Sequence, residues 1–151
     1  TDVTTVAGIY SSHIGYGLGV GVGDVSGDGF PDIYVSNDFH ENDYLYVNNG
    51  DGTFRESINK SMTHTSRFSM GNDVADINND LRPDVFTTDM LPRDESVIKT
   101  SSSEDAYEIF QFKLKYGYHP QYSRNCLQIN RGNNAGTPVF SDVAPLAGLE
   151  A

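Results

Sequence analysis

The chain has 151 residues and a formal net charge of −11, because 21 acidic residues outnumber 10 lysines and arginines. A surface this acidic repels nucleic acid and anionic lipid, so we expect neither as a partner. No apolar run approaches the ~20 residues of a membrane-spanning helix, so direct membrane insertion is not expected either.

The first third of the chain predicts four short β-strands, at about 17–24, 32–37, 43–48 and 53–58. Ile33 and Val35 alternate with outward positions, as do Leu45 and Val47, and this is the period of a half-buried strand. Residues 49–52 read Asn-Gly-Asp-Gly, which is typical of a hairpin turn. Many turns between short apolar runs indicate an all-β architecture.

The same pattern recurs further along the chain. Residues 19–35 align with 71–87 at an offset of 52, and residues 45–50 align with 127–132 at an offset of 82. The second unit therefore holds 30 extra residues (82 − 52), which lie within roughly 90–125. A third, shorter echo links residues 2–9 to 142–149.

Four-stranded units repeated at about 50 residues predict β-propeller blades. The alternating glycines at 15–23 suit a strand near the crowded axis of a propeller better than a phosphate-binding turn. Two blades cannot close a ring, so we expect either a longer protein or another chain to cover the open strand edges. We assign residues 1–14 to the end of a preceding blade or a linker, 15–68 to the first blade, 69–142 to the second blade with its insert at 90–125, and 143–151 to the start of a next blade.

The insert carries its own helical signal. Ser101 and Glu104 form an S-x-x-E capping box, and Tyr107, Phe110 and Leu114 follow with the spacing of one helix face. We therefore predict a helix over 103–116. A strand is the competing interpretation, because aromatic and apolar residues also occupy every second position at Phe110, Phe112, Leu114 and Tyr116.

An acidic loop follows the first strand of each unit, and its spacing suits calcium. Calcium prefers six to eight hard oxygen ligands on a tightly curled backbone. Each loop supplies carboxylates at positions 1, 5 and 9, a polar side chain at position 3 and a main-chain carbonyl at position 7. The expected ligands are Asp24, Ser26, Asp28, Phe30 and Asp32 in the first loop, and Asp76, Asn78, Asp80, Arg82 and Asp84 in the second. We expect about two structural calcium ions.

Two other interpretations of these loops are weaker. An EF-hand needs a glutamate at position 12 and flanking helices, whereas Val35 and Thr87 stand there and the flanks are strands. Plain acidic turns are common, but this motif occurs twice at equivalent points of aligned repeats.

The second loop departs from the first at Leu81, which must accept a backbone angle that Gly29 adopts freely. We therefore expect the second site to be weaker or strained.

Residues 23–35 and 44–54 together resemble the FG-GAP/VCBS repeat, which forms calcium-loaded blades in integrin α-chain propellers. The segments 88–94 and 140–149 are similar to the ASPIC/UnbV, cartilage-acidic-protein-like group of Bacteroidetes-type bacteria. The resemblance implies a seven-bladed propeller that is secreted, periplasmic or at the cell surface. It implies binding of protein or glycan, and no reaction.

The leading expectation is a non-catalytic, calcium-stabilised adhesion or ligand-binding module. A polysaccharide lyase or hydrolase is an alternative, because Tyr, His and Arg together could abstract a proton and neutralise a uronate carboxylate. A purely structural part of a larger surface protein is another. His40-Glu41 lacks the second histidine of a zinc-protease motif. The candidate ligand-binding residues lie at the end of the insert: Tyr116, Tyr118, His119, Tyr122 and Arg124.

Overall fold

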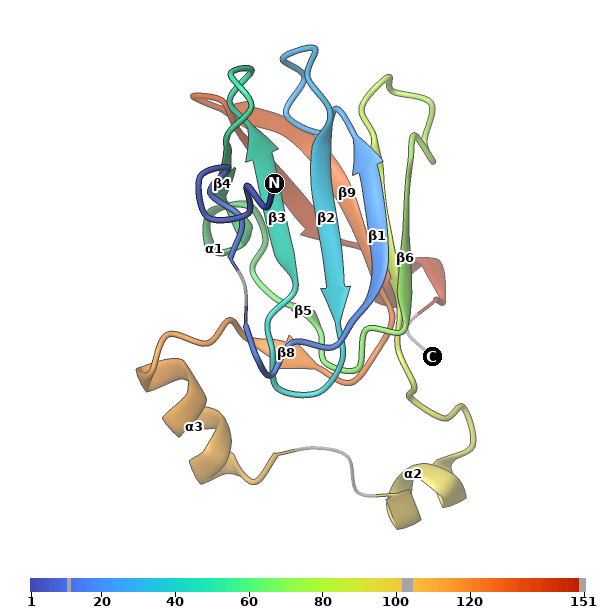
Figure 1. Cartoon of the computed structure of the whole chain (residues 1–151). Helices are drawn as coiled ribbons and strands as arrows, with labels where there is room; N and C mark the ends of the chain where they lie inside the picture. Colours follow the sequence, from blue (N-terminus) through green and yellow to red (C-terminus); the bar gives the residue numbers. More distant parts are fainter. Residues whose placement is uncertain (11, 102–104, 150–151) are drawn as a thin grey trace.

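The computed structural model describes residues 1–10, 12–101 and 105–149, which form two stacked four-stranded antiparallel sheets (Figure 1). The first sheet has the order β1 (Gly17–Gly23), β2 (Asp32–Asn37), β3 (Tyr44–Asn48), β4 (Phe54–Glu56). The second has the order β10 (Thr137–Asp142), β9 (Cys126–Asn134), β7 (Asp84–Thr88), β6 (Gly71–Ala75). The prediction of an all-β fold built from four-stranded blades is confirmed. No helix in these residues is long and apolar enough to cross a membrane.

The hydrophobic core lies between the two blades. Tyr34, Leu45 and Val47 come from the first blade, and they form one buried cluster with Val85 and Phe140 of the second. Because side chains alternate along a strand, one face of β2 and one face of β3 lie at the blade interface. The expected inward position of Leu45 and Val47 is correct, whereas that of Ile33 and Val35 is wrong. These two side chains are only half-buried and pair with the exposed Val22 and Val20 of β1, because Tyr34 between them faces the core instead.

The two blades approach each other closely where β1 of the first lies against β6 of the second. An ideal Cβ on Gly21 would lie 2.4 Å from Val74 Cγ2 and 2.5 Å from Asn72 Oδ1, both on β6. A Cβ on Gly23 would lie 2.8 Å from Val74 Cγ1. Glycine at alternate positions of β1 therefore lets the two inner strands approach backbone to side chain, as the crowded-strand interpretation predicted.

The fourth strand of the first blade, β4, ends two residues earlier than expected, at Glu56. Glu56 Oε1 accepts hydrogen bonds from the N–H groups of Leu45 (3.3 Å) and Ile58 (2.7 Å). These bonds turn the chain out of the sheet and into α1 (Ile58–Ser61), so the predicted strand over 53–58 is too long. Ile58 is fully buried in the core between the blades.

The second blade ends in the same way. Asp142 Oδ1 accepts hydrogen bonds from the N–H groups of Leu127 (3.0 Å) and Ala144 (3.0 Å), and α4 (Ala144–Ala147) follows. Leu127 is the repeat equivalent of Leu45, at the offset of 82. The residues assigned to the start of a next blade thus form a short helix in their described part, and Ala144 packs against β9.

The weak echo between residues 2–9 and 142–149 is also structural. Ala7 N–H donates to Val3 O (2.8 Å), as Ala147 N–H donates to Val143 O (2.9 Å). The bonds from residue 9 to residue 4 and from residue 149 to residue 144 also correspond. The first turn docks on the first blade, where Phe54 N–H donates to Ala7 O (2.8 Å).

The insert holds two helices, α2 (Glu95–Ser101) and α3 (Tyr107–Lys115), which lie below the blades in Figure 1. The helical interpretation is confirmed for 107–115, and α2 was not predicted. The start of the predicted helix is wrong in its described part, because Asp105 and Ala106 are not helical and Ser101 ends α2. The rest of the proposed capping box lies outside the described residues.

Charged contacts fasten the insert to the blades. Arg67 Nη2 contacts Asp105 Oδ1 (2.8 Å), and Lys113 Nζ contacts Asp105 Oδ2 (3.3 Å) and Gln121 Oε1 (3.2 Å). β8 (Gln121–Tyr122) then pairs in parallel with β5 (Thr65–Ser66), which follows α1. The end of the insert is thereby brought against the first blade.

Candidate functional site

The first acidic loop is organised by its own carboxylates. Asp24 Oδ1 accepts hydrogen bonds from the N–H groups of Gly27 (2.7 Å) and Asp28 (3.1 Å), and Asp24 Oδ2 accepts one from Gly29 (2.9 Å). Asp32 is buried at the start of β2, where its Oδ2 accepts the N–H of Ser26 (2.8 Å). Carboxylates at positions 1 and 9 therefore curl the loop from both ends.

The second loop repeats this arrangement. Asp76 accepts the N–H groups of Asp80 (3.0 Å) and Leu81 (2.9 Å), which are four and five residues ahead, as in the first loop. Asp84 is fully buried and its Oδ2 accepts the N–H of Ile77 (3.1 Å). The 52-residue repeat is thus a repeat of hydrogen bonds as well as of sequence.

Each loop is also tied to the third strand of its blade by an asparagine. Asp32 Oδ1 accepts the N–H of Asn48 (2.9 Å), and Asp84 Oδ1 accepts the N–H of Asn130 (2.8 Å). The Nδ2 groups of both asparagines donate to the proline carbonyl before the aspartate (3.0 and 3.1 Å). These two asparagines were not predicted as site residues, although their alignment at the offset of 82 is the signal that could have found them.

The oxygen donors suit calcium in type, but the side chains do not yet converge. In neither loop do three carboxylates lie with their ligand atoms within 4.8 Å of one another. The first-position and ninth-position carboxylates accept backbone N–H groups. Asp24 Oδ1 accepts two of them, and each of the other oxygens accepts one and keeps a further lone pair for a cation. The side chains at positions 3 and 5 would have to turn toward these two to complete a calcium shell.

The second loop contains two features that the first lacks. Leu81 has φ 67°, where Gly29 has φ 90°, so a leucine occupies the left-handed region as expected. Arg82 Nη2 lies 2.6 Å from Asp80 Oδ2, so a guanidinium already neutralises the carboxylate at position 5. Both features make this loop the less favourable of the two for a bound cation.

Replacing Leu81 with glycine should raise the free energy of unfolding by about 1 kcal/mol, because a left-handed backbone costs a leucine roughly 1–2 kcal/mol. Leu81 is 91% exposed, so little packing is lost. Denaturant unfolding of metal-free protein measures the effect. Leu146, 90% exposed in α4, is the matched control, and Leu146→Gly should lower stability. Equal destabilisation by both changes would contradict strain at Leu81.

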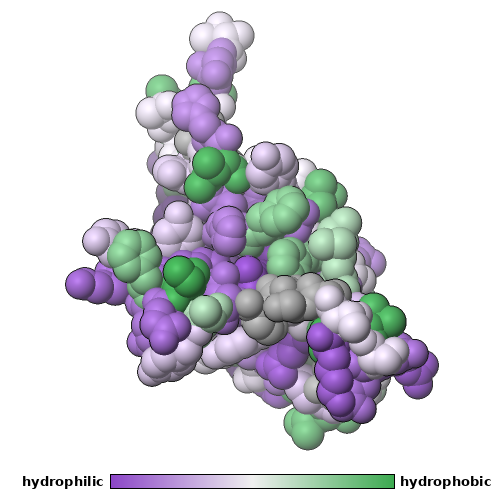
Figure 2. Space-filling view, turned by 90° about the horizontal axis from the view of Figure 1, so that it is seen from below, coloured by the Kyte–Doolittle hydropathy of each residue, from purple (hydrophilic) through white to green (hydrophobic). Residues whose placement is uncertain are grey.

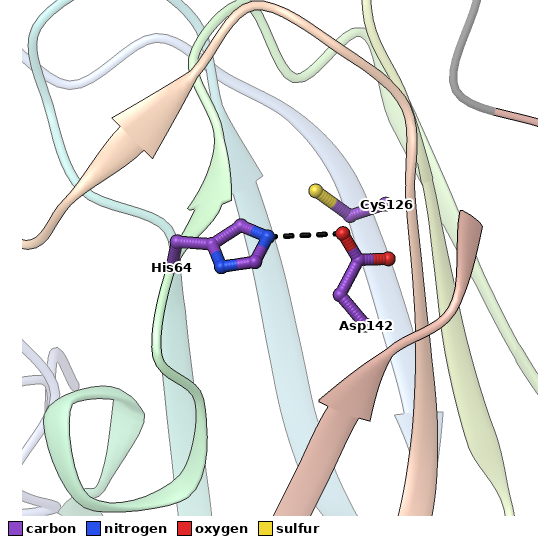
Figure 3. Close-up of side chains that lie close together, drawn as sticks. All are labelled: His64, Cys126 and Asp142. Carbon is purple, nitrogen blue, oxygen red and sulfur yellow. Dashed lines mark hydrogen bonds and ion pairs between the residues drawn. The ribbon is translucent and has the colours of Figure 1, made fainter. Parts of the chain in front are cut away.

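A different cluster meets the geometric requirement for a metal, and the structure argues against one there. His64 Nε2 lies 2.9 Å from Asp142 Oδ2, with Cys126 Sγ within 4.8 Å of both (Figure 3). Arg124 Nη2 lies 3.0 Å from both His64 Nε2 and Asp142 Oδ2, so a guanidinium supplies the positive charge. Burial raises the pKa of the Cys126 thiol, which keeps it protonated and a poor ligand or nucleophile.

The five candidate ligand residues separate into different surroundings. Tyr122 and Arg124 belong to the cluster just described, with the Tyr122 ring 5.3 Å from the His64 ring. His119 is buried and its Nδ1 lies 2.6 Å from Asn59 Oδ1. Burial lowers the pKa of His119 to about 4, so the ring is neutral at pH 7. Three of the five therefore have structural contacts.

Tyr116 and Tyr118, in contrast, line an open pocket of about 420 Å³. The other walls come from the first blade and the segment before it, including Tyr10, Glu41 and Tyr44. Sequence reasoning missed these three residues, since they belong to segments far from the insert. This pocket is where two of the five candidate residues meet the first blade.

Comparison with family models matches residues 24–87 to the FG-GAP-like repeat. The matched region begins at the first residue of the first acidic loop and ends within β7, just beyond the second loop. No curated protein matches the chain. Residues 24–87 are therefore similar to the FG-GAP-like repeat, in agreement with the resemblance inferred from the loop motif.

Proposed function

We propose that this chain is a calcium-stabilised FG-GAP/VCBS propeller module of the cartilage-acidic-protein-like, ASPIC/UnbV group, which binds protein or glycan outside the cell. The observation that carries the proposal is the twofold hydrogen-bonded acidic loop within a region similar to the FG-GAP-like repeat. Its role is non-catalytic.

The calcium ions are proposed to be structural. In the first loop Asp24, Asp28 and Asp32 would hold the ion with Ser26 and the Phe30 carbonyl. In the second, Asp76, Asn78, Asp80 and Asp84 would hold it with the Arg82 carbonyl. A bound ion neutralises carboxylates that otherwise repel one another and joins the first strand of a blade to the second.

Further blades, to a total of seven, are proposed on both sides of this pair. α1 lies between the two blades, whereas its counterparts at residues 2–9 and α4 lie on the outer faces. Leu18, Val20 and Val22 line the outer side of β1 and are exposed. An apolar strand face of this kind is suited to packing against another blade, as the two blades pack against each other here, or against another chain.

Calcium should raise the melting temperature relative to protein in EDTA. A ligand at 100 times its dissociation constant adds about 2.7 kcal/mol of stability per site, since it binds the folded state alone. Titration calorimetry should give about two sites. Asp28→Ala should remove the contribution of the first loop, whereas Asp51→Ala, in the exposed hairpin outside both loops, should leave the calcium response unchanged.

Identical melting in calcium and in EDTA, together with no heat of binding, would sink the calcium proposal. A glycan and protein array probed with and without calcium tests the binding role. If the protein binds nothing on the glycan array and nothing on the protein array, the result would favour the alternative of a purely structural part of a larger surface protein.

No observation favours the lyase or hydrolase alternative. His119, its expected base, is buried and hydrogen-bonded to Asn59, and Arg124 is paired with Asp142. A uronate would meet carboxylates rather than arginine in the pocket that Tyr116 lines. We therefore propose no reaction.

A further inference from the structure

The pocket beside the insert is built from three separate segments of the chain. The N-terminal segment contributes Tyr10, the first blade contributes Glu41, Tyr44 and Glu56, and the turn after α3 contributes Tyr116 and Tyr118. Its volume of about 420 Å³ is within the range of small-ligand sites. Seen from below, hydrophobic residues are mixed with hydrophilic ones and form no single apolar patch (Figure 2).

Four of the nine residues that line the pocket are tyrosines. The Tyr44 ring lies 5.6 Å from the Tyr10 ring and 5.6 Å from the Tyr46 ring, which fixes its orientation. Tyr116 lies 4.4 Å from the ring of Phe112 on α3, and Gly117 with φ 86° turns the chain toward Tyr118. The rings thus come from two sides of the pocket, with Tyr44 on β3 and Tyr116 just after the end of α3.

Glu41 is held against these rings and is only 5% exposed. Its Oε1 accepts the Tyr44 hydroxyl (2.7 Å) and the Asn42 N–H (3.2 Å). Its Oε2 makes no hydrogen bond with any residue that the structure describes. This oxygen is not among the buried side-chain atoms left without a partner, so it keeps some access to solvent and a ligand that brings positive charge or a donor can reach it.

Asp43, two residues after Glu41, holds the loop that carries Glu41 in place through hydrogen bonds. This fully buried carboxylate accepts hydrogen bonds from the Tyr34 hydroxyl (2.6 Å), the Asn37 N–H (2.8 Å) and the Ser69 hydroxyl (3.1 Å). Burial raises the pKa of Asp43 to about 7. Because these contacts come from β2 and from the start of the second blade, Glu41 sits on a preorganised support.

The charge of the wall has a single sign. Glu41 and Glu56 are its carboxyl groups, and within the described part of the chain no lysine, arginine or histidine lines the pocket. The nearest cation on its rim is Lys113, whose Nζ lies 5.8 Å from the centre of the Tyr118 ring. The whole chain adds to this potential with its net charge of −11. An anionic sugar would be repelled, and a neutral sugar would leave the carboxylate charge uncompensated.

We infer that this pocket binds the ammonium or guanidinium group of a lysine or arginine side chain from a protein partner. Tyrosine faces attract such cations, and Glu41 and Glu56 supply the opposite charge. Ile109 and Phe112 are exposed on α3 next to Tyr116, which gives the partner an apolar surface beside the cation. The inference names the ligand class of the binding role proposed above and rests on it.

The test uses NMR titration of the whole calcium-loaded chain with N-acetyl-arginine amide, N-acetyl-lysine amide and tetramethylammonium chloride, against sodium chloride and N-acetylglucosamine. The cations should shift the signals of Tyr10, Tyr44, Tyr116 and Tyr118, with the two amino-acid amides binding more tightly than tetramethylammonium. Neither control should shift them. Equal binding of tetramethylammonium would show that a free quaternary amine, rather than a protein side chain, is the ligand.

Two variants make the test specific. Glu41→Gln keeps an acceptor for Tyr44 and should weaken cation binding about tenfold, and Tyr116→Ala removes an exposed ring that the fold does not need. Glu108→Gln, an equal charge change on the exposed side of α3, should bind like wild type. Wild-type affinity in both pocket variants, or equal binding of the sugar, would overturn the inference.

The outcome is separable from that of the proposed function. Array binding that survives Glu41→Gln and Tyr116→Ala would overturn the cation pocket and leave the binding module intact. Cation binding without any array partner, and without a calcium-dependent melting shift, would overturn the proposed function while the pocket chemistry stands.

Discussion

Asp84→Ala should destabilise the protein by about 2–6 kcal/mol in the absence of any metal. Asp84 is fully buried, and its two oxygens accept the N–H groups of Ile77 and Asn130. Alanine leaves both donors without an acceptor, at about 1–3 kcal/mol for each. Denaturant unfolding in EDTA measures the loss directly, because calcium cannot contribute under that condition.

Asp80→Ala in the same loop is the matched control. Its carboxylate contacts Arg82 and its own loop and is partly exposed, so the metal-free protein should lose at most about 1 kcal/mol. In calcium both variants should lose, in addition, the stabilisation contributed by the ion in the second loop, because both residues are proposed ligands of it. Equal stability of the two variants in EDTA would show that Asp84 does not anchor the blade.

Gly21→Ala should lower the free energy of unfolding by about 1–3 kcal/mol through overpacking. The added Cβ would lie 2.4 Å from Val74 Cγ2 and 2.5 Å from Asn72 Oδ1, closer than real Cβ contacts. Neither neighbour can move freely, since Val74 packs against the core and Asn72 Nδ2 donates to Ser36 Oγ (2.9 Å). The blades would have to separate along β1 and β6.

Gly17→Ala provides the control on the same strand. Its Cβ would lie 3.6 Å from Asn37 Oδ1 and 3.6 Å from Val35 Cγ1, which is ordinary contact distance. This variant should unfold like wild type in the same denaturant series. Comparable losses in both variants would mean that strand propensity, rather than the interblade contact, explains the effect.

The strands and acidic loops of the first blade were predictable because their signals are local. Alternation along residues 32–37 identifies a strand, although it pointed to the wrong face, since Tyr34 rather than Ile33 and Val35 lies in the core. The aspartates and glycines of 24–32 describe a curled loop by themselves. Repetition at offsets of 52 and 82 then extended the assignment to the second blade. Leu81 could be identified as strained for the same reason, since its partner in the repeat is a glycine.

The end of β4 required the three-dimensional structure. Residues 57 and 58 continue the strand pattern, but Glu56 reaches across to Leu45 and begins α1. The two-residue strands β5 and β8 likewise carry no local pattern, since their pairing depends on where the insert returns.

The sequence by itself therefore determined the repeated blade and the two oxygen-rich loops. The pattern that identifies each strand and each loop lies within a few residues that are neighbours along the chain. Tertiary structure alone decided which side chains form a pocket. It buried His119, paired Arg124 with Asp142, and placed Tyr116 beside Glu41. The physical reason is distance along the chain: Tyr10, Glu41 and Tyr116 meet only after the insert has folded back onto the first blade.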